Sequence, residues 1–163
     1  MPTPTDRFPR DVTTDGVTVG LSLMTAGDRD EMVAFAKALP PHDLLFLRRD
    51  ITRIDAVDAW IREIDDGEIY TVLAHEGERL VGYSTLHLSR QAWSRHVAEI
   101  RVVVAEGMRG KGLGGLLTQE VFTLALEVEK IVARMTLDLR DRETVARSKA
   151  SSYSDHRYRT PRV

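Results

Sequence analysis

The residues with the clearest chemical potential lie in one short glycine-rich segment, Gly107 to Gly115, which also carries Arg109 and Lys111. Glycine permits positive φ angles and lets the backbone approach a ligand closely. An amphipathic stretch follows the segment, and the N-terminal end of a helix carries about half a positive charge with N–H groups that point outward. This combination predicts a cradle for a bulky anion, reinforced by the two cationic side chains.

Two well-known phosphate-binding patterns fit this segment less well. A P-loop requires Gly-Lys followed by Ser or Thr, whereas Lys111 is followed by Gly112. The dinucleotide pattern G-x-G-x-x-G is matched by Gly110, Gly112 and Gly115, but that motif opens a unit of parallel strands with an acidic residue about 20 positions on. Here the segment follows strands of hairpin type, so we set both interpretations aside.

The elements that must position the segment are indicated by hydrophobic periodicity. Apolar residues alternate from Val17 to Leu23, as in a half-buried strand, and recur at helical spacing after Leu113. The whole pattern predicts an α/β protein with a mixed central sheet. The strands are expected over 17–23, 69–75, 80–88, 97–104 and 131–137, and the helices over 28–39, 55–64, 113–128 and 141–150.

Composition narrows the possible functions. The chain has 163 residues, a formal net charge of −2 and no cysteine, which favours one domain and removes thiolate chemistry and disulfides. Five scattered histidines lack the short spacings of zinc sites, so we expect no metal. Since no apolar run approaches the roughly 20 residues of a membrane span and the N-terminus lacks a signal-peptide core, we expect a cytoplasmic protein without membrane contact.

The glycine-rich segment also carries a resemblance to a known family. Residues 109–114, Arg-Gly-Lys-Gly-Leu-Gly, match the Arg/Gln-x-x-Gly-x-Gly/Ala signature of the GNAT superfamily of N-acetyltransferases, and the order of elements over 17–139 is similar to that family's. The resemblance implies the acyl-CoA N-acyltransferase fold and acetyl-CoA as cosubstrate. The cofactor-binding residues that it implies are the pyrophosphate loop Arg109, Gly110, Lys111, Gly112, Leu113 and Gly114, and the pantetheine-binding strand Val102, Val103 and Val104, whose backbone groups would be exposed where it splays from the next strand.

The resemblance further implies transfer of an acetyl group to a primary amine by direct attack on the thioester. Glu99 is the expected base, with apolar neighbours that would raise its pKa, although it could instead pair with a cation. Tyr153 stands near the family's usual acid. His87 and His96 could relay a proton or be structural, and Trp60, Trp93 and Phe46 could form an aromatic wall or pack in the core. The acidic body would suit a cationic acceptor, or would simply be solvated surface.

The C-terminus departs from the family pattern. Residues 140–163 carry seven Lys and Arg against three acids, and the apolar and Gly-Phe residues of the family's last two strands are absent, as in a truncated or altered end. We therefore expect a flexible arm over 1–15, one domain over 16–146 and a basic, disordered tail over 147–163, and we expect no nucleic-acid partner. A missing hairpin would expose a strand edge and permit a homodimer. It also keeps open an alternative function, a catalytically silent acyl-CoA-binding or regulatory module.

Overall fold

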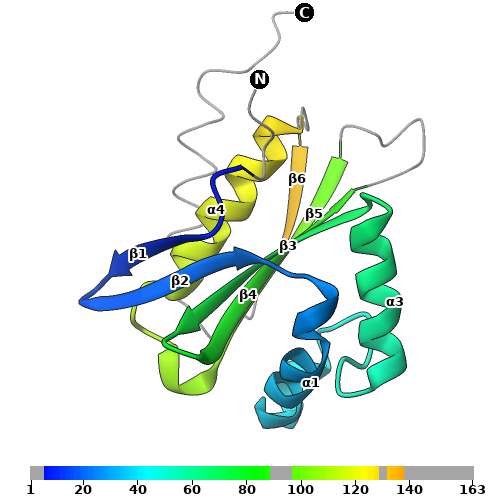
Figure 1. Cartoon of the computed structure of the whole chain (residues 1–163), viewed down its shortest axis with the longest axis horizontal. Coiled ribbons are helices and arrows are strands. Elements are labelled where there is room, and N and C mark those ends of the chain that lie inside the picture. Colours follow the sequence, from blue (N-terminus) through cyan, green and yellow to red (C-terminus); the bar gives the residue numbers. More distant parts are fainter. Residues whose placement is uncertain (1–5, 89–96, 129–131, 138–163) are drawn as a thin grey trace, which may run out of the picture.

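A single sheet of six strands, in the order β1-β2-β3-β4-β5-β6, organises the protein in a computed structural model that describes residues 6–88, 97–128 and 132–137 (Figure 1). Neighbouring strands are antiparallel except β5 and β6, which run parallel. The predicted mixed sheet is thus confirmed. The strands are β1 (Arg10–Thr14), β2 (Val17–Leu23), β3 (Ile69–Glu76), β4 (Arg79–Leu88), β5 (Val97–Val104) and β6 (Val132–Leu137).

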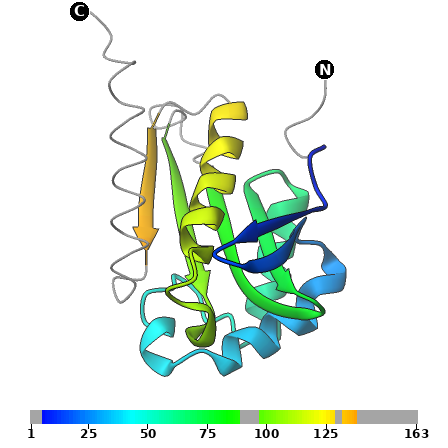
Figure 2. The same ribbon diagram turned by 90° about the vertical axis from the view of Figure 1, so that its left-hand side faces the viewer.

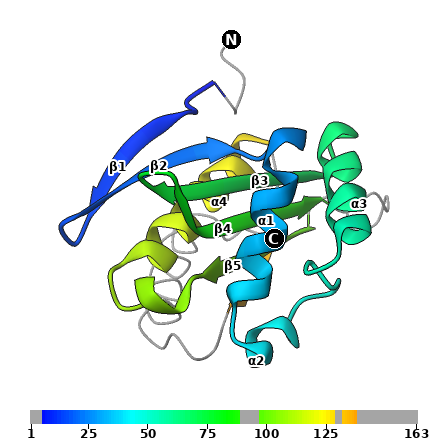
Figure 3. The ribbon, with the colours of Figure 1, turned by 60° about the horizontal axis from the view of Figure 1, so that its bottom comes forward.

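Helices cover both faces of this sheet. Helices α1 (Arg29–Ala38) and α3 (Ile54–Asp65) lie on one face and α4 (Leu113–Glu127) lies on the other (Figure 3). Figure 2 shows α4 running alongside β5. A short helix, α2 (Pro41–Leu44), follows α1, with proline at its first position, where the missing N–H costs nothing. The sequence predicted only a stop at these prolines. Three-residue helical turns at Ala26–Asp28 and Glu106–Met108 complete the described elements.

The alternation of side chains along β5 divides the core into two clusters. Ile100, Val102 and Val104 pack in the cluster that includes α4, whereas Val103 packs with α1 and α3. Odd-numbered β5 residues therefore face α1 and α3, because successive side chains of a strand point to opposite faces. Glu99 and Arg101 share this face, which holds the polar site described below.

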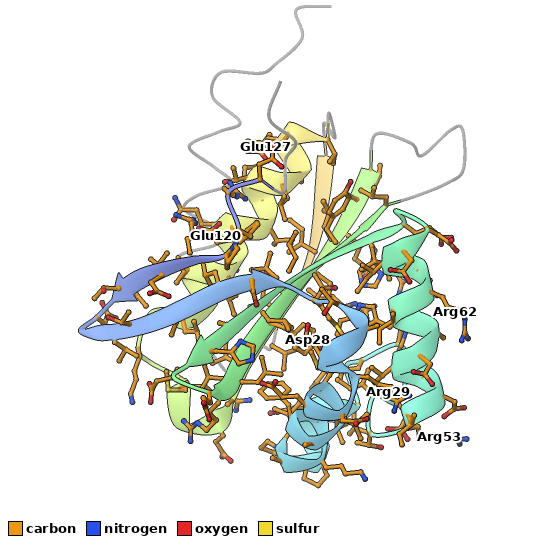
Figure 4. All side chains as sticks on the ribbon, in the orientation of Figure 1. Asp28, Arg29, Arg53, Arg62, Glu120 and Glu127 are labelled. Carbon is orange, nitrogen blue, oxygen red and sulfur yellow. The ribbon has the colours of Figure 1, made fainter. Side chains whose placement is uncertain are left out.

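The N-terminal residues differ from the sequence prediction. Within the segment expected to be a flexible arm, Arg10–Thr14 forms strand β1, which pairs with β2 from Arg10↔Leu21 to Thr14↔Val17. The tight turn at Asp15 and Gly16, both at positive φ, closes this hairpin. Arg10 is also paired with Glu120 of α4, whose position beside β1 is seen in Figure 4. The prediction failed because β1 contains one apolar residue, Val12, and so shows no period-2 pattern.

Several predictions concern residues outside those that the structure describes. They are the helix over 141–150, Tyr153, the basic tail over 147–163, the missing final hairpin, His96 and Trp93. Homodimer formation, the 16–146 domain boundaries and cytoplasmic location also stay predictions. Within the described part of the chain, no helix combines the length and hydropathy needed to cross a membrane.

Candidate functional site

The glycine-rich segment connects β5 to α4, and Gly107, Gly110 and Lys111 are exposed within it. Gly110 and Gly112 take φ angles of 77° and 78°, in the left-handed region, and α4 begins at Leu113. The first hydrogen bond of α4 runs from the Leu116 N–H to the Gly112 carbonyl, 3.1 Å away. The N–H groups of the three preceding residues therefore lie at the open end of the helix, where no intrahelical acceptor exists. A Cβ on Gly110 would meet nothing within 4 Å.

The two cations of this segment are placed differently. Lys111 is exposed at the start of the helix, as the anion cradle requires. Arg109 instead pairs with Asp43 of α2, whose side chain is only 4% exposed, and its guanidinium also donates to the Val104 carbonyl at 3.4 Å. Arg109 thus ties α2 to the end of β5 beside the cradle. The sequence did not predict Asp43 as its partner, since 66 positions separate the two residues.

The end of β5 presents backbone groups in alternation. The Ala105 N–H donates to the Val81 carbonyl at 2.8 Å, and Val103 stands opposite Tyr83 in the same antiparallel register. Since backbone groups of alternate residues face opposite neighbours, Val103 faces β4 whereas Val102 and Val104 face the side of β6. Pairing with β6 continues to Val102↔Leu137. The expectation that all three valines expose backbone groups is therefore corrected. The backbone groups of Val103 face β4, Val102 is still paired with Leu137 of β6, and Val104 lies beyond the last described pair.

Glu99 lies in an ion-pair cluster rather than among apolar neighbours. Its Oε1 accepts hydrogen bonds from Nε and Nη2 of Arg101 at 3.0 and 2.8 Å, and its Oε2 accepts one from Arg48. Burial raises the pKa of Glu99, but the hydrogen bonds and charges of Arg101 and Arg48 outweigh it and hold the pKa below its usual value. The expectation of a raised pKa is wrong, and the alternative of pairing with a cation is what the structure shows.

A pocket lies beside this cluster, on the face of the sheet that α1 and α3 cover. Trp60 of α3 and Tyr83 of β4 have ring centroids 5.2 Å apart, and the Trp60 Nε1–H donates to Thr71 at 3.0 Å. Of the two alternatives for Trp60, the structure shows core packing, since Trp60 is almost fully buried among the residues under α1 and α3, whereas Phe46 is exposed and packs on His42. The described lining residues are Leu47, Arg48, Arg49, Ile51, Trp60, Tyr83, Thr85, His87 and Arg101.

Two further titratable groups belong to this pocket. His87 stands opposite Glu99 on β4, and its Nε2 lies 3.0 Å from the Thr85 hydroxyl. Burial, supported by the nearby charge of Arg101, lowers the pKa of His87 to about 4, so its imidazole is neutral at pH 7. Burial raises the pKa of Tyr83 well above its ordinary value, so its hydroxyl stays protonated.

The basic side chains of the pocket are functional candidates that sequence reasoning missed. Arg48, Arg49 and Arg101 carry no motif, and only the strand alternation of Glu99 and Arg101 signals that these two share a face. None of the described lining residues of this pocket is acidic, and the expectation that acidic residues surround the acceptor stays a prediction. The described residues also contain no group of three or more His, Asp or Glu placed to hold a metal ion.

A sheet that ends in a parallel pair, with a glycine-rich connection between β5 and α4, is the arrangement that the resemblance to the GNAT superfamily predicts. The model of the acetyltransferase (GNAT) family matches residues 30–148, and the chain therefore belongs to this family of acetyltransferases. No curated protein matches the sequence.

Solved structures share the fold at low sequence identity. An N-acetyltransferase from Staphylococcus aureus Mu50 aligns with a TM-score of 0.69 and 15% identity over 82% of each chain. The GNAT domain of S. lividans PAT gives 0.65 and 18% over 77% of each chain. A ribosomal-protein-alanine N-acetyltransferase from Brucella melitensis gives 0.66 and 19% over 80% of this chain and 82% of that one.

Proposed function

We propose that the protein is an acetyl-CoA-dependent N-acetyltransferase that acts on a primary amine. The observation that carries the proposal is the cradle between β5 and α4, where Gly110 and Gly112 adopt left-handed conformations and α4 presents its first N–H groups together with Lys111. Such a site suits a pyrophosphate, because backbone N–H groups and the helix dipole both favour negative charge. Arg109, Leu113 and Gly114 complete the loop.

The described residues fit acetyl-CoA beyond the cradle as well. Val104 directs its backbone groups away from β4 at the end of β5, where its N–H can bond an amide of a pantetheine arm running toward Arg101 and Glu99, while its carbonyl already accepts from Arg109. Val102 precedes Val104 by two residues and directs its backbone groups to the same side. Val103 directs its backbone groups to β4 and so holds β5 in the sheet. Bound acetyl-CoA would supply the acetyl group, which the amine takes by direct attack on the thioester carbon as the thiol departs.

The chain's own groups would then control protons at the reaction centre. Glu99 as the base and Tyr153 as the acid stay predictions. The contacts of Glu99 favour a second task, since each of its carboxylate oxygens accepts from a guanidinium and thereby fixes Arg48 and Arg101 at the pocket. His87 is neutral at pH 7 and lies within the same pocket, so its imidazole can hydrogen-bond there without adding charge.

Two measurements test this function. Titration calorimetry of the folded apo protein with acetyl-CoA is expected to show one saturable site, and the lack of any binding heat would end the proposal. Thiol release from acetyl-CoA, followed with a panel of primary amines, amino acids and lysine peptides, is expected to exceed the rate without acceptor. Binding without thiol release for every acceptor would instead identify a non-catalytic acyl-CoA-binding module.

A further inference from the structure

The pocket beside Glu99 carries an inference about the acceptor that rests on the proposed function. We propose that this pocket binds a carboxylate group of the amine acceptor, through the guanidinium groups of Arg48 and Arg101. The acceptor would therefore be an amino acid or a similar amine that also carries a carboxylate, and not a simple amine or polyamine.

The position of the pocket relative to the cradle supports this assignment. Both lie along β5: Val104 stands beside the cradle, and Arg101 is three residues earlier, about 10 Å away by the rise of a strand. Arg101, Thr85 and Tyr83 face α1 and α3, the side opposite α4. A ligand in the pocket thus meets β5 on the face that α1 and α3 cover, three residues along the strand from the cradle.

The charge of the pocket favours an anion. Three guanidinium groups line it, from Arg48, Arg49 and Arg101, and the carboxylates paired with them are those of Glu99 and Glu63. His87 and Tyr83 add no charge at pH 7, because the pKa of His87 is lowered to about 4 and that of Tyr83 is raised. The cluster therefore carries one net positive charge, which one carboxylate neutralises and an ammonium group alone would oppose.

The arginines are held in place before any ligand arrives. Glu99 uses one oxygen on Arg101 and the other on Arg48, and its side chain is only 13% exposed. Arg49 donates to Glu63 at 2.6 Å and to the Ala56 carbonyl at 3.5 Å. A guanidinium has five N–H groups in a fixed plane, and the bonds to Glu99 use two of those on Arg101. Such a planar group recognises a carboxylate through two parallel hydrogen bonds.

The remaining walls limit what the pocket can hold. Leu47, Ile51 and Trp60 line the pocket next to the arginines, but Ile51 and Trp60 are almost fully buried, and the pocket has a volume of only about 20 Å³. It therefore has room for a group of a few atoms, such as a carboxylate, beside the Thr85 hydroxyl. A single net charge matches a carboxylate better than a phosphate group, which carries close to two charges at pH 7. The chemistry that fits is an amine with one carboxylate, whose other atoms lie outside this small pocket.

The test compares matched acceptors by their rates of thiol release. The probes are alanine, leucine and phenylalanine, each paired with its carboxamide, and 3-methylbutylamine as leucine without its carboxylate. The wild-type protein is expected to prefer at least one acid over its amide by about tenfold or more in kcat/KM. Equal rates for acids and amides, or a preference for a phosphonate analogue of leucine, would overturn the proposal while leaving the acetyltransferase function intact.

Arg48 carries the mutational test because its side chain is 66% exposed and its replacement is compatible with folding, unlike that of buried Arg101. Arg48→Gln is expected to reduce the preference for the acid to within about threefold. Arg53→Gln is the matched control: Arg53 is 67% exposed, pairs with Asp55 beside the pocket segment and lies at the outer edge of the molecule (Figure 4). An equal loss of preference in both variants would contradict a specific role for Arg48.

A binding readout makes the test independent of turnover. Titration calorimetry with N-acetylalanine, N-acetylleucine and N-acetylphenylalanine is expected to show that one of these products binds at least about tenfold more tightly than its amide, and that Arg48→Gln removes the difference. If no N-acetyl acid binds better than its amide, the carboxylate site is excluded. If acetyl-CoA fails to bind while an N-acetyl acid does, the proposed function fails but the carboxylate site stands.

Discussion

The anion cradle and the arginine pocket are built in different ways. The cradle consists of consecutive residues between β5 and α4 and offers mainly backbone N–H groups, so its chemistry depends on φ angles and on the start of a helix. The pocket consists of side chains from four places in the chain, the 47–51 segment, α3, β4 and β5. One site is thus encoded locally, and the other exists only after the sheet has formed.

Because of this difference, amino-acid substitutions affect the two sites differently. On the proposed function, the backbone groups of the cradle would recognise a feature that every acyl-CoA shares and would tolerate changes in neighbouring side chains. Side chains such as Arg48 or Trp60 can change one at a time without disturbing the cradle. We infer that the cradle fixes the donor and that the pocket sets the acceptor, and substitutions in the two regions should have separable effects.

The largest expected effect is on the stability of the pocket. Arg101→Met removes one partner of a largely buried ion pair, since the side chains of Arg101 and Glu99 are 10% and 13% exposed. The free energy of unfolding should fall by about 3 kcal/mol, because Glu99 would keep only Arg48. Urea denaturation measures this change. The double variant Arg101→Met with Glu99→Gln should recover part of the loss, and additive losses would show that the two residues are not coupled.

The next effect concerns donor binding at the cradle. Gly110→Val places a branched side chain at a φ of 77° and fills the space in front of the helix, so acetyl-CoA should bind about 30-fold more weakly, or about 2 kcal/mol. Titration calorimetry gives the affinity. Gly77→Val is the matched control, because Gly77 has a φ of 61° and an equally open surround in the β3–β4 turn. A comparable loss of affinity in the control would assign the effect to strain instead.

A smaller effect should follow from the burial of His87. Burial lowers its pKa from 6.5 to about 4, so the folded state takes up this proton at lower pH than the unfolded state. The stability linked to His87 is complete above pH 6.5 and is lost as the pH falls toward 4, and with partial solvent screening it should amount to about 1–2 kcal/mol. Urea denaturation across this range should show the loss in wild type and a shallower dependence in His87→Gln. Identical slopes would contradict the burial of a neutral imidazole.

The smallest effect is expected in the pH dependence of catalysis. Because Arg101 and Arg48 hold the pKa of Glu99 below its usual value of 4.5, its ionisation should leave no step in kcat/KM above about pH 5. Glu99→Gln should therefore lower kcat/KM while keeping the shape of the pH profile. An acid limb near neutral pH that disappears in Glu99→Gln would show instead that the acceptor raises this pKa, as a general base of the usual kind requires.

Much of the fold was predictable because the apolar residues recur at the period of the strand or helix that contains them. The strands at Val17–Leu23 and Val97–Val104 and the helix from Leu113 have apolar residues at the spacing of their own element, and the structure confirms them. Strand β1 was not predictable in this way, since four of the five side chains of Arg10–Thr14 are polar. This strand is held by its pairing with β2 and by the ion pair between Arg10 and Glu120. Pairing of this kind leaves no local signature.

The candidate site likewise has one part that adjacent residues determine and another that depends on residues distant in the sequence. The sequence by itself determined the cradle, because left-handed glycines and a helix start require only adjacent residues. Tertiary structure decided the rest. It brought Arg109 onto Asp43, turned Val103 toward β4, and surrounded Glu99 with two arginines that lower the pKa which apolar neighbours would have raised. Burial and charge pairing act through space between distant residues, and spacing along the chain does not record them.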